Sequence, residues 1–140
     1  MAALKSQGVG FFRFSANVSP NAYTEVPDVV SITGPDGSAT EIDVTALDSA
    51  AKEFLMGLPD EGTVQLELIW GGETGNAEQV ALRTARANQT SNTYQIRLTD
   101  SPRSTYQFTA YVTGWSLSAG VDDAVKCNVT LRITGAVSSV

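Results

Sequence analysis

The residues best suited to chemistry are few in this sequence. Histidine is absent, which removes the commonest general base and every Ser-His or Cys-His pair. The single cysteine, Cys127, falls on the apolar side of an alternating segment, so we expect a buried and inert thiol. The carboxylates Glu41, Asp43 and Asp48 are too widely spaced for a calcium loop. These residues predict no catalytic site, no metal site and no cofactor, and an enzyme has the least support of any function.

A glycine-rich segment, Gly71 to Gly75, precedes a predicted helix and is the next candidate. Backbone amides at the start of a helix can hold a phosphate. The segment lacks the Lys and the Ser or Thr of a phosphate-binding loop, and Glu73 would repel a phosphate. We therefore interpret it as a connection between a strand and a helix.

Length and charge limit the remaining classes of protein. A chain of 140 residues with 42% apolar residues is expected to form a single domain over 1–140 without help from disulfides or metal. The net charge is −6 and the nine basic residues are scattered, so the chain is a poor candidate for wrapping nucleic acid. No segment has the run of about 18 apolar residues that a membrane span needs, and the first ten residues lack the apolar core of a secretion signal.

The elements that would position any site are mostly strands. Alternating apolar and polar residues predict strands over 8–14, 28–33, 39–45, 63–70, 92–99, 103–118 and 124–134. The turn from Gly34 to Ser38 is expected to join the second and third strands in a hairpin. A helix is predicted over 77–87, capped by Asn76 with Gln79 completing the capping pattern, and a short helix over 47–57. The sequence thus predicts an all-β sandwich or barrel of antiparallel strands with one flanking α-helix.

The last two predicted strands share a polar face with few charges. Gly114 interrupts the alternation of the first of them, which predicts a bulge or bend. Such a face is either the solvated side of a sandwich or the lining of a water-filled passage, and the pattern leaves both open. The candidate lumen-facing residues are Gln107, Thr109, Tyr111, Thr113, Lys126, Asn128, Thr130 and Arg132.

Five runs of the sequence resemble the major tail tube proteins of long-tailed, lambda-like phages, the siphoviruses. They are VSITGP at 30–35, EIDVTALDS at 41–49, KEFLMGLPDEGTV at 52–64, YQFTAYVTGW at 106–115 and VTLRITG at 129–135. The likeness extends from about residue 25 to about residue 135, and its middle run is the most specific part.

The resemblance implies a structural protein of the virion, made in the cytoplasm of the bacterial host. It implies two packed antiparallel sheets in a tail tube β-sandwich or barrel, and six copies in a ring with four strands each in an inner barrel. Rings would stack around a tape measure protein, between tail terminator and tail-tip proteins. Genome DNA would leave through the tube without specific binding, and no membrane takes part. No additional immunoglobulin-like domain is expected after the tail tube domain.

One observation fits badly with a passage that should repel DNA. Lys126 and Arg132 are basic, yet they lie on the candidate lumen face. Either they face neighbouring subunits, or the acidity of the lumen comes from turn residues such as Asp100, Asp122 and Asp123.

Contacts between copies are expected in the polar segment 15–27, interpreted as an extended arm or loop, and in the region 34–48. The candidate residues are Val18, Tyr23, Pro35, Asp36, Glu41, Asp43 and Asp48. One alternative is the tube protein of a contractile secretion system with the same architecture. Another is a monomeric module, such as a carbohydrate-binding sandwich, for which Trp115 and Tyr111 would supply an aromatic platform.

Overall fold

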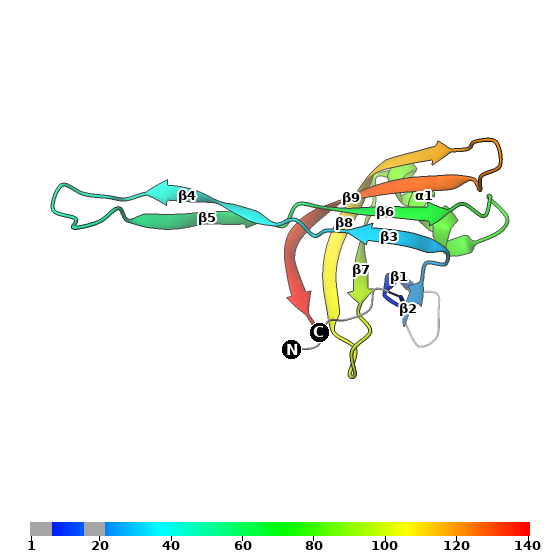
Figure 1. The fold of residues 1–140 in the computed structure, drawn as a ribbon, viewed down its shortest axis with the longest axis horizontal. Coiled ribbons are helices and arrows are strands. Elements are labelled where there is room, and N and C mark those ends of the chain that lie inside the picture. The colour runs from blue at the N-terminus through cyan, green and yellow to red at the C-terminus, as the bar shows by residue number, and fades with distance from the viewer. Residues whose placement is uncertain (1–6, 16–21) are drawn as a thin grey trace.

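A computed structural model describes residues 7–15 and 22–140 (Figure 1). The strands are β1 (Gly10–Ser15), β2 (Ala22–Glu25), β3 (Val29–Thr33), β4 (Ser38–Asp43), β5 (Phe54–Asp60), β6 (Thr63–Ile69), β7 (Ser91–Arg97), β8 (Thr105–Ser118) and β9 (Lys126–Ser139), and the helix is α1 (Ala77–Asn88). Seven strands form one antiparallel sheet of order β2-β1-β7-β8-β9-β6-β3, and β4 and β5 form a second antiparallel sheet. The predicted all-β class with a flanking helix is confirmed.

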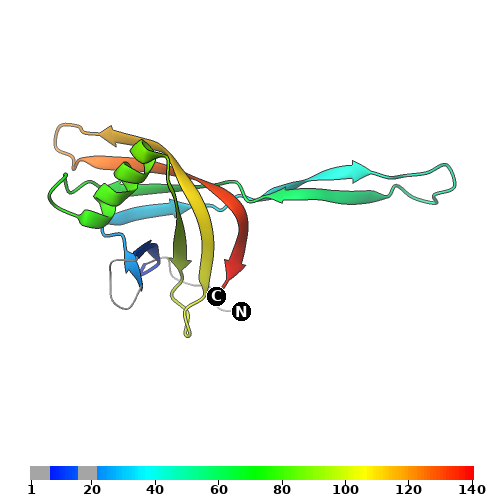
Figure 2. The same ribbon diagram turned by 180° about the vertical axis from the view of Figure 1, so that it is seen from behind.

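The seven-stranded sheet bends until its two ends approach each other (Figures 1 and 2). The long strands β8 and β9 run through both layers of the bent sheet. The register of β8 shifts between Val112 and Gly114, and Gly135 in β9 has a φ of +86°. Bulges and glycines allow a strand to turn from one layer to the other. The predicted irregularity at Gly114 is therefore confirmed.

The core lies inside this bend, on the inner face of the sheet. Alternate residues of a strand point to the same face of the sheet, and cross-strand partners share a face. The apolar side chains of neighbouring strands therefore point to the same side. The pairs Leu66–Val129 and Val64–Leu131, for example, join buried residues of β6 and β9. The core cluster comprises Phe11, Val26, Val64, Leu66, Leu68, Leu82, Tyr94, Ile96, Phe108, Ala110, Val112, Cys127, Val129, Leu131 and Ile133.

The second sheet is a hairpin that projects far from the rest of the molecule (Figure 1). We call residues 35–61 the arm, and the other described residues the body. β3 leads into β4 and β5 leads into β6, so the arm prolongs the β3–β6 pair. The turn at its tip lies between Asp43 and Phe54 and is closed by hydrogen bonds such as Thr45 N–H to Asp43 Oδ1 at 2.9 Å.

The structure corrects the predicted hairpin at Gly34 to Ser38. β3 pairs with β6 and β4 pairs with β5, so the chain does not reverse there. Instead Asp36 Oδ1 accepts a hydrogen bond of 2.7 Å from the Thr63 N–H on the opposite segment. Glycine and proline suited this segment to a turn, but pairing with residues far along the chain satisfies more backbone groups than a local reversal would.

The predicted helix over 47–57 is also wrong. Residues 54–57 belong to β5, where Phe54, Leu55 and Met56 pair with Asp43, Ile42 and Glu41 of β4. The cross-strand ladder provides hydrogen bonds that override a modest helix propensity.

Helix α1 is present where the sequence predicts it, but its N-terminus is built differently. Asn76 occupies the cap position without a side-chain hydrogen bond to the helix. Gln79 is buried instead, accepting from Gly71 N–H and donating to the Pro27 and Ile69 carbonyls at 2.8–2.9 Å. The glycine-rich segment before the helix is thus tied to the body by a side chain, which agrees with its interpretation as a connection.

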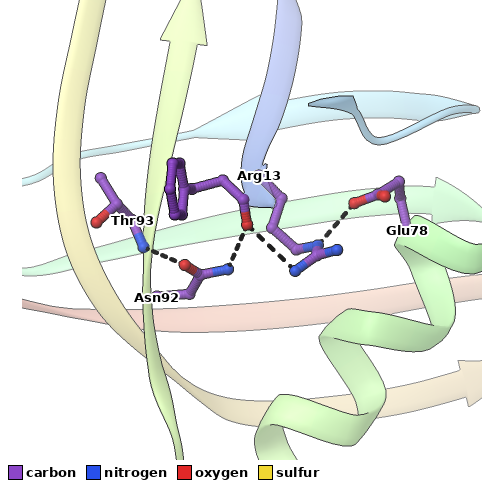
Figure 3. A network of polar contacts seen from close by, with 5 residues as sticks. Arg13, Glu78, Asn92 and Thr93 are labelled. Carbon is purple, nitrogen blue, oxygen red and sulfur yellow. Dashed lines mark hydrogen bonds and ion pairs between the residues drawn. The ribbon is translucent and has the colours of Figure 1, made fainter. Parts of the chain in front are cut away.

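A second polar contact holds α1 against β1 (Figure 3). Arg13 Nε lies 2.6 Å from Glu78 Oε2, and both side chains are largely buried. The Phe14 carbonyl accepts from Arg13 Nη1 and from Asn92 Nδ2, at 3.3 and 3.0 Å. This network joins β1, α1 and the start of β7, and it fixes the helix over the inner face of the sheet.

Candidate subunit interfaces and lumen face

The outer face of β8 and β9 is the candidate lumen face. Cross-strand register places Tyr111 beside Arg132 and Thr109 beside Thr134, so these side chains share one face. On β6, Gln65 pairs with Thr130 and Glu67 with Asn128, which extends the same polar face across a third strand.

The structure brings most of the predicted lumen-facing residues together. Tyr111, Asn128 and Arg132 are exposed, and Thr109, Thr130 and Lys126 are partly exposed. Gln107 is partly buried and accepts a hydrogen bond of 2.9 Å from Gln95 Nε2. Thr113 is the additional residue at the β8 bulge, between the Val112 and Gly114 pairs, and its hydroxyl donates to the Thr130 carbonyl. It is exposed but out of phase with the others.

The two cations on this face are paired with acids. Arg132 Nη2 lies 2.5 Å from Asp60 Oδ2, at the base of the arm. The hydrogen bond from Arg132, together with one from the Gly62 N–H, lowers the pKa of Asp60. Lys126 Nζ lies 3.9 Å from both Glu67 Oε1 and Asp123 Oδ1. The face is therefore close to neutral, which answers the objection that its basic residues would hold DNA.

The predicted contact residues fall into two groups. Pro35 and Asp36 lie at the base of the arm, Glu41 and Asp43 lie on β4, and Asp48 lies in the turn at the tip. Tyr23 belongs to the body instead, where its ring packs edge-on against Phe14 with centroids 5.4 Å apart. Val18 lies outside the described residues.

The arm also carries apolar residues that sequence reasoning missed. Ile42 pairs with Leu55 on one face, and Phe54 and Met56 lie on the other face beside the acids of β4. All of these side chains are exposed, as are Leu47 at the tip and Leu58, which is 93% exposed. The sequence contains the apolar run from 54 to 56, but this run was assigned to a predicted helix and not to an exposed strand.

The remaining candidates have structural roles. Burial of the Cys127 thiol raises its pKa to about 11, which agrees with an inert side chain. Trp115 faces inward, packs against Trp70 with centroids 5.4 Å apart, and pairs with buried Val129, whereas Tyr111 faces outward. The bulge between them puts the two rings on opposite faces, so they form no aromatic platform.

Two absences apply to the described ranges 7–15 and 22–140. No group of three Cys, Asp or Glu side chains there is arranged to hold a metal ion. No helix in the same ranges is long and apolar enough to cross a membrane.

Comparison with known proteins gives this fold a family. The family model described as "Lambda phage tail tube protein, TTP" matches residues 7–139. The solved tail tube of phage SPP1 is similar with a TM-score of 0.73 and 15% identity, over 98% of this chain and 78% of that one. The tail of a gene transfer agent particle, refined with C6 symmetry, gives 0.76 and 13%, over 99% of both chains. No curated protein matches.

A contractile injection system has a similar subunit. The sheath/tube terminator of an extracellular contractile injection system gives a TM-score of 0.74 at 13% identity, over 100% of this chain and 98% of that one. At such identities the structural likeness shows a shared fold. The family match extends over nearly the whole chain and decides between the two kinds of tube.

The fold and its exposed arm define a structural subunit built for assembly. The chain belongs to the lambda phage tail tube protein family. It is a structural component of the phage tail tube, and therefore of the virion.

Proposed function

We propose that six copies of this chain form a ring through the edges of the four strands β3, β6, β9 and β8. Residues 112–118 of β8 pair with β9 on one side. Within the described residues they have no strand on the other side, because the pairing of β7 ends where Ser91 meets Tyr111. β3 is the terminal strand at the far side of these four strands. Open strand edges readily pair with further strands, and this observation carries the proposal.

Strand direction supports closure of the ring. All neighbours among the four strands are antiparallel, so β3 and β8 run in opposite directions. Rotation about a ring axis preserves direction, and β3 of one copy would therefore meet β8 of the next in the antiparallel sense. Twenty-four strands spaced by about 4.8 Å and tilted by about 40° would close a circle with a backbone diameter of roughly 48 Å, which is wide enough for a DNA duplex.

The outer polar face would line the bore of this ring. It presents hydroxyl and amide groups from Thr109, Asn128 and Thr130, with Lys126 and Arg132 neutralised by neighbouring acids. A surface without net positive charge does not attract the phosphates of DNA. DNA would pass without specific binding, and the subunit would act through self-assembly rather than catalysis.

The arm would contact another copy in the next ring of the stack. Its apolar residues have no cover within the described part of the chain, and large exposed apolar patches mark interaction sites. Pro35, Asp36, Glu41, Asp43 and Asp48 lie on this arm and would take part in the contact, and Tyr23 and Val18 would contribute from the segment 15–27.

The remaining partners follow from membership of the family. The stack would enclose a tape measure protein and end on tail terminator and tail-tip proteins. The subunit would be synthesised in the cytoplasm of the bacterial host, with 1–140 acting as a single tail tube domain and no membrane taking part.

Electron microscopy of the purified, concentrated protein tests this proposal. Hollow tubes with six-fold rings are expected, and a helical reconstruction should place the outer faces of β6, β8 and β9 against the bore. A reconstruction with α1 against the bore, or with β3 and β8 of adjacent copies far apart, would contradict the assignment.

A further inference from the structure

One arginine stands apart from the other cations of the body. Arg13, Arg83, Lys126 and Arg132 each pair with a carboxylate. Arg97 donates to Gln95 Oε1, and Arg103 donates to backbone carbonyls such as that of Leu98. Arg86 is exposed in the last turn of α1, and its side chain makes no hydrogen bond or ion pair with any residue that the structure describes. A positive charge near the C-terminus of a helix is favourable by itself. This explains the position of Arg86 in the helix but not the groove beside it.

A groove does lie beside Arg86, at the open edge of β8. It has a volume of about 530 Å³ and is lined by Arg86, Ala87, Gln89, Tyr111, Val112 and Thr113. Tyr111 is the last residue of β8 that pairs with β7, and Val112 and Thr113 lie beyond that pairing, at the open edge. A cation without a partner therefore borders a strand edge without a partner, and no acid lines the groove.

The complementary charge lies on the arm. Residues 35–61 hold seven of the fifteen acids and one of the nine bases, so the arm carries the whole net charge of −6 and the rest of the chain has eight of each. Asp36 and Glu61 lie at the base of the arm. Asp36 Oδ1 accepts from Thr63 N–H, whereas Glu61 is partly exposed and makes no ion pair within the described residues.

Strand order brings these two features together between copies. Along the sheet, Val112 and Thr33 lie at the end from which the arm projects, and Ser118 and Val29 lie at the other end. In the register that sets Thr33 of one copy level with Val112 of the next, β3 of the first copy runs beside β8 of the second, and the base of the arm meets the Val112 end of that β8. Glu61 then lies in the region of the neighbour's Arg86.

The opposite end of the same strand pair is matched by apolar residues. Val30 of β3 is 55% exposed and Leu117 of β8 is 50% exposed. Both lie toward the end of the sheet remote from the arm, so the same docking would bury them against each other. Apolar contact at one end and opposite charges at the other define one register and one direction.

We infer that Arg86 of each copy binds Glu61 at the arm base of the adjacent copy in a ring, while Leu117 packs against Val30 of that same neighbour. This inference rests on the proposed ring. It goes further by naming the second copy's acidic arm base as the ligand of the groove at Arg86.

Charge exchange tests the ion pair. R86Q should raise the critical concentration for assembly by about tenfold or more, because Glu61 would be left unpaired in the interface. R83Q is the matched control, since Arg83 lies on the same helix but pairs with Glu73 of its own chain. R86E should abolish assembly and R86E with E61R should restore it. Equal losses in R86Q and R83Q, or no rescue in the double variant, would overturn the inference.

Disulfide trapping tests the strand pair independently. V30C with L117C should yield, after oxidation of assembled protein, a ladder of covalent oligomers up to the hexamer, whereas V30C alone should yield none. The buried thiol of Cys127 is a poor competitor. Rings of the unaltered protein without a ladder in the double variant would overturn this inference alone. If the unaltered protein and the tail components together gave no rings at all, both the proposed function and this inference would fail.

Discussion

The arm continues the β3 and β6 strands of the body, but the two regions differ in what covers their side chains. Leu66 in β6 is 2% exposed because the inner face of the body sheet has its own core. Leu55 in β5, earlier in the same stretch, is 58% exposed, and the arm has no second layer. An isolated two-stranded hairpin is marginally stable in water. The body is therefore a folded unit, whereas the arm leaves both of its faces exposed, and we propose that it is half of an interface.

Charge follows the same division. The chain outside the arm has equal numbers of acids and bases, while the arm holds the net charge of the chain. Acids on a hairpin discourage indiscriminate edge pairing and favour a partner with positive groups. We propose that these acids select the surface that the arm binds.

Matched leucine substitutions in the body and in the arm are the strongest test of this difference between the two regions. We expect Leu66→Ala to lower the free energy of unfolding by about 3 kcal/mol, because it leaves a cavity in the core. Leu55→Ala should change the stability of the monomer by less than about 0.5 kcal/mol, and it should reduce tube formation. Urea denaturation of the monomer and microscopy of assembled samples give the two readouts. Equal losses of stability would mean that the arm has a core of its own.

The junction between body and arm should be the next most sensitive place. Gly34 has a φ of +108°, and a Cβ there would lie 2.3 Å from the Thr63 carbonyl oxygen. We expect Gly34→Ala to destabilise the protein by about 2 kcal/mol or more. Gly72→Ala is the control, since Gly72 has a φ of +82° with nothing near its missing Cβ. That variant should lose about 1 kcal/mol or less. Thermal unfolding of both would reveal whether crowding at the junction matters.

The ion pair at the base of the arm should matter less. Arg132→Gln is expected to change monomer stability only slightly, because the pair is exposed. The pKa of Asp60 is lowered in the folded protein, so the pair persists above the ordinary Asp range and is lost as pH falls through the lowered pKa. NMR titration of Asp60 should show its pKa rise in Arg132→Gln. An unchanged value would mean that Arg132 does not hold the arm base.

A small effect on the monomer is also expected at the β8 bend. A Cβ at Gly114 would lie 3.4 Å from Thr130 Cβ and Oγ1, an ordinary contact, and its φ requires no glycine. Gly114→Val should therefore change monomer stability by less than about 1 kcal/mol. It should still hinder assembly, because a branched side chain alters the outer face beside the open edge. Normal tubes from this variant would show that the bend does not depend on glycine.

These contrasts also explain what the sequence could predict. Strands β6, β8 and β9 and helix α1 carry complete local patterns, since each buries one face against the body's own core. In the arm only the segment 39–45 alternates, and it predicted β4. β5 gave no such pattern, because both faces of the arm are exposed in one copy and its strand partners lie more than ten residues apart. The segment from Gly34 to Ser38 predicted a local turn, and 47–57 predicted a short helix. The sequence nevertheless indicated residues 35, 36, 41, 43 and 48, which lie on the arm, as candidate contact residues. It did not indicate the apolar residues in 54–58.

The most direct test of this division replaces the arm. Residues 35–61 can be exchanged for an Asn-Gly turn, because β3 and β6 are already antiparallel neighbours. The shortened protein should unfold cooperatively at nearly the temperature of the full chain, and it should form no stacked tubes under conditions where the full chain forms them. Normal tubes without the arm, or a body that no longer folds, would contradict the account.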